Sequence, residues 1–280
     1  MIYIHNEGTP RYNEEKIIAN YLDTQCSEID ATTEDIQKEI SLLEDYKKSV
    51  ITEAVTKGLN PDAEMKDSGI AWIGEIPKHW KWCKVKNSTS FAGSGTTPTS
   101  SNQDCYDGDI NWIQSGDLYK IVVVDTVEKK LTVKALKSFS ALHIYQAPFI
   151  VMAMYGASVG NTAFSKIDAC CNQACCCIKN NKLFDLEFMY YWLDFAQIDF
   201  LGRAIGGTQP NISQDKIKNQ YIVKPSLEEQ QQIADFLDAK CSEIDAIIAD
   251  KKRQLDILTE YKKSLIYEYV TGKKEVPINE

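Results

Sequence analysis

The residues of this sequence best suited to chemistry are its cysteines and histidines. Five cysteines crowd into Cys170–Cys177, whereas zinc sites usually draw C-x₂-C pairs from separate turns. Alternate residues of a strand point to opposite faces, so the cluster predicts a buried strand. His5, His79 and His143 lie far apart in the sequence and in no H-E-x-x-H or G-x-S-x-G frame. We therefore expect no catalytic residue, no metal site and no cofactor.

Polar loops offer a different chemistry, which is contact with nucleic acid. The loop that begins Gly93-Ser94-Gly95-Thr96-Thr97 lacks the lysine of a nucleotide-binding P-loop, and its amides and hydroxyls suit DNA phosphates better. Amide and hydroxyl side chains can also bond base edges. The candidate DNA-binding residues are Thr96, Thr97, Thr99, Ser100, Trp112, Gln114, Ser115, Tyr155, Thr208, Gln209 and Asn211.

Composition and charge are compatible with such a role. The chain has 280 residues, 44% hydrophobic and 25% charged, as in soluble globular proteins. Its net charge of −9 divides into −8 for residues 1–69, +3 for residues 70–225 and −4 for residues 226–280. The acidic flanks therefore set the net charge of the whole chain, although its middle is mildly basic. The absence of a signal sequence or a long apolar run leads us to expect a cytoplasmic protein with free thiols and no membrane contact.

An internal repeat organises the chain. Residues 18–56 and 233–271 align without a gap at an offset of 215, and 20 of the 39 positions are identical. Both copies are rich in helix-forming residues and contain neither proline nor glycine. Gly58 and Gly272 follow them, as glycines follow helix ends. Each copy is thus predicted to be one long helix.

Heptad spacing predicts that the two helices pack together. The seam positions are Cys26, Ile29, Thr33, Ile36, Ile40, Leu43, Lys47 and Val50 in the first copy, and Cys241, Ile244, Ile248, Lys251, Leu255, Leu258, Lys262 and Leu265 in the second. The first helix leads into the middle of the chain and the second leads out of it. We therefore expect two antiparallel helices that form a coiled-coil stalk for one globular domain.

The middle of the chain has the pattern of a single mixed domain. Short β-rich runs occur at Trp80–Lys86, Lys120–Val124, Phe149–Met154 and Gln220–Val223, and Leu186–Leu201 has the pattern of a helix. The predicted fold class is α+β. The expected divisions are an irregular segment at 1–13, a helix at 14–58, a mixed α/β domain at 59–225, a second helix at 226–272 and a tail at 273–280.

This layout resembles the DNA-specificity subunit of Type I restriction-modification systems. The similar phrases are Asp67–Trp80 at the entry to the domain, Gly95-Thr96-Thr97-Pro98 with Ile110–Leu118, Met154–Gly160 with Asn172-Gln173, and Gly207–Ser213 with Pro225–Gln230 at its exit. A complete subunit of this family alternates two target-recognition domains with two helices. Because this sequence contains one such domain, we expect a half-length or truncated form.

The resemblance implies a non-catalytic protein that reads DNA sequence. Residues 59–225 would bind one half of a bipartite target in double-stranded DNA. The helices would dock the methyltransferase subunit, which carries the S-adenosylmethionine chemistry, and the restriction subunit would join through the complex. Two copies of the chain could also form a homodimer. The alternative is a coiled-coil adapter or inactive remnant that binds the methyltransferase but no DNA.

Overall fold

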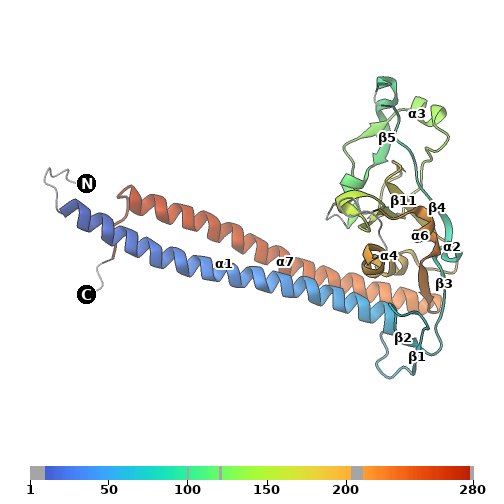
Figure 1. Ribbon diagram of the computed structural model, residues 1–280, viewed down its shortest axis with the longest axis horizontal. Helices are drawn as coiled ribbons and strands as arrows, with labels where there is room; N and C mark the ends of the chain where they lie inside the picture. The colour runs from blue at the N-terminus through green and yellow to red at the C-terminus, as the bar shows by residue number, and fades with distance from the viewer. Residues whose placement is uncertain (1–9, 100, 120–121, 203–210, 278–280) are drawn as a thin grey trace. The chain divides into compact units, whose positions relative to one another are not determined.

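The computed structural model describes residues 10–99, 101–119, 122–202 and 211–277 (Figure 1). The chain divides into two compact units, one made of residues 1–49 and 239–280 and the other of residues 50–238. None of the helices in the described ranges is both long enough and apolar enough to cross a membrane.

The first unit is an antiparallel pair of helices. Helix α1 (Pro10–Lys57) contributes its residues up to Ser49, and helix α7 (Leu227–Val270) contributes its residues from Ala239 onward (Figure 1). One apolar cluster joins Leu22 and Ile29 of α1 to Leu265 and Tyr269 of α7. A second joins Ile36 and Ile40 to Ile244 and Ile248. Residue numbers rise along one helix as they fall along the other, so the predicted antiparallel stalk is confirmed.

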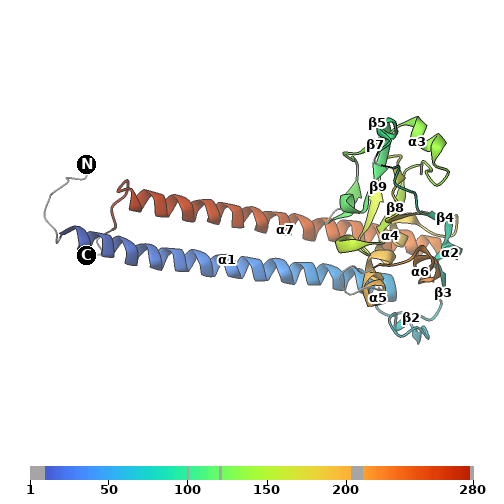
Figure 2. The ribbon, with the colours of Figure 1, turned by 45° about the horizontal axis from the view of Figure 1, so that its top comes forward.

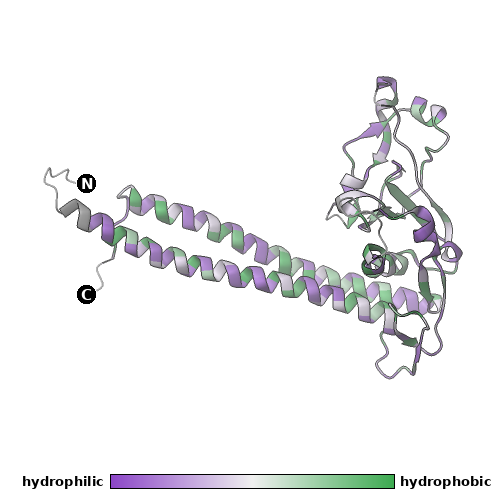
Figure 3. Ribbon diagram, in the orientation of Figure 1, coloured by the Kyte–Doolittle hydropathy of each residue, from purple (hydrophilic) through white to green (hydrophobic). Residues whose placement is uncertain are grey.

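The predicted heptad seam is also confirmed. Every seam position of this unit is buried or half-buried, while most residues between them are exposed. Figure 3 shows the corresponding alternation of hydrophilic and hydrophobic residues along both helices. The lysines that interrupt the seam form ion pairs across it, as Lys251 does with Glu39 at 2.5 Å. A long lysine stem can pack in the seam while its ammonium reaches an acid on the facing helix.

Glycine ends both helices, as the sequence predicts. Gly58 (φ 76°) follows the last residue of α1, and its N–H donates to the carbonyl of Ala54 at 3.0 Å. Gly272 (φ 68°) follows α7 and donates to the carbonyl of Tyr269 at 3.2 Å. A positive φ costs glycine little, so it can turn the chain away from the helix axis at each end.

The second unit is built around a five-stranded sheet of order β4-β11-β8-β9-β6. Neighbouring strands in this sheet are antiparallel, except for β6 and β9, which are parallel. The strands are β4 (Thr89–Gly93), β11 (Cys175–Asn180), β8 (Phe149–Ala153), β9 (Thr162–Ser165) and β6 (Val123–Val124). Helix α4 (Leu186–Phe195) packs on this sheet (Figure 2).

Smaller sheets extend the domain. Strand β5 (Tyr106–Ile113) pairs in parallel with β10 (Cys170–Cys171) and antiparallel with β7 (Lys130–Leu131). Two antiparallel ribbons join β1 (Met65–Asp67) to β2 (Glu75–Pro77), and β3 (Lys81–Lys84) to β12 (Tyr221–Lys224). The remaining helices are α2 (Val85–Ser88), η1 (Gln103–Cys105), η2 (Ser115–Leu118), α3 (Val133–Ser138), η3 (Gly156–Ser158), α5 (Gln197–Gly202) and α6 (Gln214–Asn219).

Element bounds inside this domain differ from the sequence pattern in several places. The predicted strand Gln220–Val223 is observed at Tyr221–Lys224, and the predicted strand Lys120–Val124 at Val123–Val124, with Lys120 and Ile121 outside the described residues. The predicted helix over Leu186–Leu201 is divided into α4 and α5, with a break at Ala196. The predicted strand over Trp80–Lys86 ends at Lys84, because Val85 is fully buried and begins the short helix α2. The burial of Val85 in the folded domain therefore overrides the period-two pattern of the local sequence.

Candidate nucleic-acid interface

The centre of the candidate site is the turn Asn172–Ala174, which connects β10 to β11. Its backbone bonds to three other segments. Asn172 donates its N–H to the carbonyl of Ile113 at 3.0 Å and accepts from the N–H of Gly95 at 3.3 Å. Ala174 accepts from the N–H of Met154 at 2.7 Å. The turn thereby holds together parts of the molecule that are far apart in the sequence.

Gly95 approaches this turn too closely for any other residue. A Cβ at this position would lie 1.8 Å from the carbonyl oxygen of Cys171. Two residues further on, the Thr97 hydroxyl donates to the amide oxygen of Gln173 at 2.6 Å. The glycine therefore lets the loop touch the sheet, and Thr97 fixes its position.

The segment before α6 joins the same site. Ile212 donates its N–H to the carbonyl of Met154 at 2.8 Å, and Tyr155 forms an antiparallel β-bridge with Asn211. Tyr155 is 44% exposed, and Asn211 is exposed as well. A phenol and an amide thus lie next to each other on the surface, in reach of a ligand.

An open groove of about 540 Å³ has Thr97 in its lining. Its lining residues are Thr97, Gln103, Tyr106, Asp107, Trp112, Gln114, Glu128, Lys129 and Lys130. The Lys129 ammonium donates to the side-chain oxygen of Gln114 at 3.2 Å, which orients the amide. The groove therefore presents amide, hydroxyl, ammonium and carboxylate groups within a small space.

The structure brings several of the predicted site residues together. Thr97 and Gln114 line the groove, and Tyr155 pairs with Asn211. Thr99 is exposed, and Thr96 and Ser115 are half-buried. Trp112 also lines the groove, but it is only 2% exposed and packs in an apolar cluster with Leu131 and Cys170. Ser100, Thr208 and Gln209 fall outside the described residues.

Sequence reasoning missed two residues of this site. Gln173 holds Thr97, and Lys129 holds Gln114. Gln173 belongs to one of the sequence motifs that carry the family resemblance, and this motif was a signal for its role. Lys129 had no such signal, because its partner is set by the pairing of β5 with β7.

The cysteine cluster forms part of the core, as predicted. Cys170, Cys171, Cys175, Cys176 and Cys177 are all fully buried. Burial raises the pKa of Cys170 and of Cys176 to about 12, with a further contribution from the neighbouring Cys171. Neutral thiols of this kind behave as small apolar side chains. Within the described residues, no three or more His, Cys, Asp or Glu side chains are grouped so that they could hold a metal ion.

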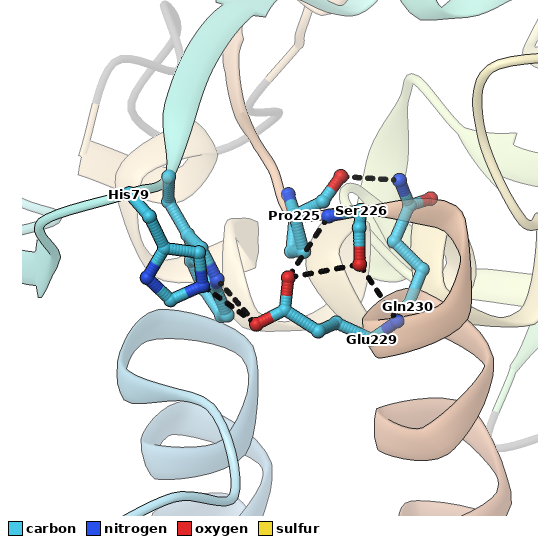
Figure 4. A network of polar contacts seen from close by, with 6 residues as sticks. His79, Pro225, Ser226, Glu229 and Gln230 are labelled. Atoms are coloured by element: carbon cyan, nitrogen blue, oxygen red, sulfur yellow. Dashed lines mark hydrogen bonds and ion pairs between the residues drawn. The ribbon is translucent and has the colours of Figure 1, made fainter. Parts of the chain in front are cut away.

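The segment Pro225–Gln230 anchors the start of α7 and does not form a surface site (Figure 4). Glu229 accepts from the Ser226 N–H at 3.0 Å and from the His79 Nε2–H at 2.7 Å. Gln230 is fully buried, and its amide donates to the carbonyl of Pro225 at 3.1 Å. Partial burial alone would raise the pKa of Glu229, but the hydrogen bonds from His79, Ser226 and Trp80 hold it at about 2.

The chain thus combines a long antiparallel pair of helices with a mixed domain in which separate segments bond to one turn. Residues 77–256 match the family model of the Type I restriction modification DNA specificity domain, and the chain belongs to this family. The resemblance stated from the sequence is thereby confirmed.

Known relatives agree with this assignment. The specificity subunit of the type I restriction enzyme MjaIX from Methanocaldococcus jannaschii is 34% identical over 190 residues, which are 66% of this chain and 42% of that one. The putative MjaX specificity subunit of the same organism is 28% identical over 95% of this chain and 59% of its own length. The chain therefore spans about half of these relatives.

The fold is shared with solved structures. A chain solved in a study of the assembly and conformational transition of the type I R-M system matches 93% of this chain and 60% of its own length, with a TM-score of 0.71 at 15% identity. The HsdS subunit from Thermoanaerobacter tengcongensis matches 92% and 58%, with a TM-score of 0.56 at 16% identity. The predicted α+β fold class is thus confirmed.

Proposed function

We propose that this chain reads DNA sequence for a Type I restriction-modification complex without supplying a catalytic group. Residues 59–225 act as a target-recognition domain that binds one half of a bipartite target. The observation that carries this proposal is that three segments, around Gly95, Ile113 and Met154, bond to one turn, and that Ile212 bonds in turn to Met154. Loops fixed in this way can hold side chains against base edges with little loss of entropy on binding.

The readout surface in this proposal consists of Thr97, Gln114, Tyr155, Gln173 and Asn211. We refer to these five residues as the readout site. Amides bond adenine edges well, and hydroxyls serve either bases or phosphates. Thr96, Thr99, Ser100, Ser115, Thr208 and Gln209 are proposed as flanking contacts.

The stalk is proposed to dock methyltransferase subunits at two equivalent places. Leu42 and Tyr46 on α1 are 68% and 55% exposed, and Ile257 and Tyr261 on α7 are 61% and 52% exposed. The two pairs are related by the repeat offset of 215. Apolar side chains that a two-helix stalk leaves exposed at repeated positions favour two copies of one helical partner.

Binding measurements test both parts. A gel-shift titration over a random duplex library, with and without the methyltransferase subunit, should reveal a binding preference for one half-target sequence. The absence of any sequence preference in either case would instead support a coiled-coil adapter that binds no DNA. The variants L42A/Y46A and I257A/Y261A should each weaken the methyltransferase complex, whereas the control pair K38A and R253A, also 215 residues apart, should leave it unchanged.

A further inference from the structure

Two side chains in the lining of the open groove, Gln114 and Lys129, are joined to each other. The Lys129 ammonium lies 3.2 Å from Oε1 of Gln114. An ammonium carries donors and no acceptor, so it bonds the oxygen of the Gln114 amide and not its nitrogen. The contact therefore fixes which way the amide faces, with its NH₂ group on the branch away from the contact.

The backbone holds both residues in place. Gln114 directly follows β5, and its N–H donates to the Asp117 carboxylate at 2.8 Å. Lys129 directly precedes β7, and its carbonyl accepts from the N–H of Trp112 at 3.1 Å. Strands β5 and β7 are hydrogen-bonded partners and lie next to each other in Figure 2. Side chains on a fixed backbone lose less entropy on binding, which favours a role in recognition.

Together the two side chains present hydrogen-bond donors. Lys129 offers ammonium hydrogens and Gln114 offers its NH₂ group, while the amide oxygen is engaged by the lysine. In the major groove of DNA, guanine is the base with two adjacent acceptors, N7 and O6. Thymine offers one acceptor beside a methyl group, and cytosine offers a donor. A pair of donors therefore matches guanine best.

Adenine is the base that an isolated glutamine would suit. Such a glutamine accepts from adenine N6 through its oxygen and donates to N7 through its nitrogen. At Gln114, an N6 amino group brought to the oxygen would also meet the Lys129 ammonium, so that two donors would face each other. Donors left unpaired in a desolvated interface cost binding free energy. Lys129 thereby acts against adenine as well as for guanine.

The rest of the groove lining favours a base edge over a phosphate. Asp107 and Glu128 also line the groove, and both are exposed. A carboxylate repels a phosphate, but it accepts a hydrogen bond from the N4 amino group of cytosine. Donors that suit guanine and acceptors that suit its paired cytosine thus line one groove of about 540 Å³.

We propose that this groove reads a G·C pair of the DNA half-target, with Gln114 and Lys129 as the residues that select guanine. The inference rests on the proposed DNA-binding function and assigns a base to one part of the readout site. Lys129 both donates to guanine and orients Gln114. The two residues therefore determine specificity as a unit and not as independent contacts.

Selection from a random duplex library tests the assignment of the base. The full-length chain is used in complex with the methyltransferase subunit, and the bound duplexes are sequenced. The wild-type complex should require guanine at one position that depends on both residues. Gln114→Ala and Lys129→Ala should each lower this preference roughly 5- to 100-fold at the same position, and the double variant should lower it little further. Lys137→Ala removes one exposed charge from α3 and is the control, which should keep the preference.

Base analogues test the contact itself in a fluorescence titration. Replacing the selected guanine by 7-deazaguanine removes N7 and should weaken wild-type binding roughly 5- to 20-fold. Inosine keeps N7 and O6, so its binding should stay within about twofold. The effect of 7-deazaguanine should vanish in Q114A/K129A and persist in K137A. Gln114→Glu replaces a donor by an acceptor and should favour cytosine at this position instead. Thermal unfolding of all variants verifies folding.

The outcomes separate this inference from the proposed function. If the wild-type complex selects a half-target in which no guanine depends on Gln114 and Lys129, the inference is overturned and the proposed function stands. If the two variants relax the preference at an adenine, Gln114 reads adenine in the usual bidentate way, which also overturns the inference. If the wild-type complex prefers no sequence at all, the proposed function fails and the inference fails with it.

Discussion

Lys47 of α1 lies 2.6 Å from the carboxylate of Asp245 in α7. The same contact occurs a second time, between Lys262 and Asp30, also at 2.6 Å. Each residue of one pair is the repeat equivalent of a residue in the other, at the offset of 215. The sequence duplication therefore appears in the structure as an approximate two-fold symmetry of the stalk, with lysines that leave the apolar seam to pair across it.

Charge reversal tests this symmetry. Lys47→Glu places like charges opposite Asp245 and should lower the unfolding midpoint by about 1–3 °C, because partly exposed ion pairs contribute little. The swap K47E/D245K should recover most of the loss. The same changes in the Lys262–Asp30 pair serve as the matched control and should give equal effects in a differential scanning experiment. Unequal effects would show that the two halves of the stalk are not energetically equivalent.

Glu229 should make stability depend on pH at acidic values. Its pKa is held at about 2, below the ordinary 4.5, so the folded state favours the ionised form. The stabilisation is complete above about pH 4.5 and is lost as the pH falls toward 2. After allowance for solvent screening we expect it to be roughly 1 kcal/mol.

The variant Glu229→Gln checks this expectation, because it removes the ionisable group and part of the helix cap. The free energy of unfolding of the variant should fall below that of the wild type near pH 7, and the two should converge toward pH 2. The neighbouring Glu228 is exposed, so Glu228→Gln is the control and should follow the wild type. A constant difference at every pH would exclude ionisation of Glu229 as the cause.

Gly95 should not tolerate a methyl group. Gly95→Ala would bring a Cβ to 1.8 Å from the Cys171 carbonyl oxygen, and backbone must move to relieve the clash. We expect a loss of about 2 kcal/mol or more in the free energy of unfolding, together with weaker DNA binding. Gly116 has nothing within 4 Å of a Cβ, so Gly116→Ala should change stability by less than about 0.5 kcal/mol. Comparable losses in urea titrations of the two variants would argue against a tight turn at Gly95.

Asn211 should contribute to discrimination between DNA sequences rather than to general affinity. Asn211→Ala should weaken binding to the selected target by about 1–3 kcal/mol and leave binding to random duplex nearly unchanged. The exposed Asn60, in a loop of the same unit, provides a control through Asn60→Ala. An equal loss on both duplexes would mean that Asn211 does not read bases.

The stalk could be predicted from sequence because its signals are local and repeated. Heptad spacing, the absence of glycine and proline, and a 39-residue self-alignment all concern neighbouring residues or identical letters. The strand order of the domain could not be predicted in this way. Strand β10 pairs with β5, about 60 residues earlier, through contacts that depend on the whole fold.

The candidate site likewise contains features that the sequence could predict and features that it could not. Thr97, Gln114 and Asn211 were predicted from side-chain chemistry and family motifs, as was Trp112, which the structure shows to be nearly fully buried. An indole in a β-rich run suits a DNA surface or a core equally well, and only the packing of β5 on β10 decides between them.

Thiol reactivity should separate the nine cysteines into two groups. Only Cys26 and Cys83 are half-buried, and the other seven are buried. Burial raises the pKa of Cys175 and of Cys177 well above the ordinary value, so their thiolate population at neutral pH is very small. Iodoacetamide should therefore label Cys26 and Cys83 first. The pKa of Cys83 is itself raised by burial, so Cys26 should react faster of the two.

Peptide mass spectrometry after timed alkylation measures these rates. In the folded protein, the peptides that contain Cys170–Cys177 should stay unlabelled while Cys26 is fully modified, and all nine thiols should react alike in denaturant. Cys26→Ser is the control for assignment and should remove the fast phase alone. Rapid labelling of Cys175 or Cys177 in the folded chain would contradict the buried sheet, because an alkylating reagent reaches an interior strand only when the domain opens.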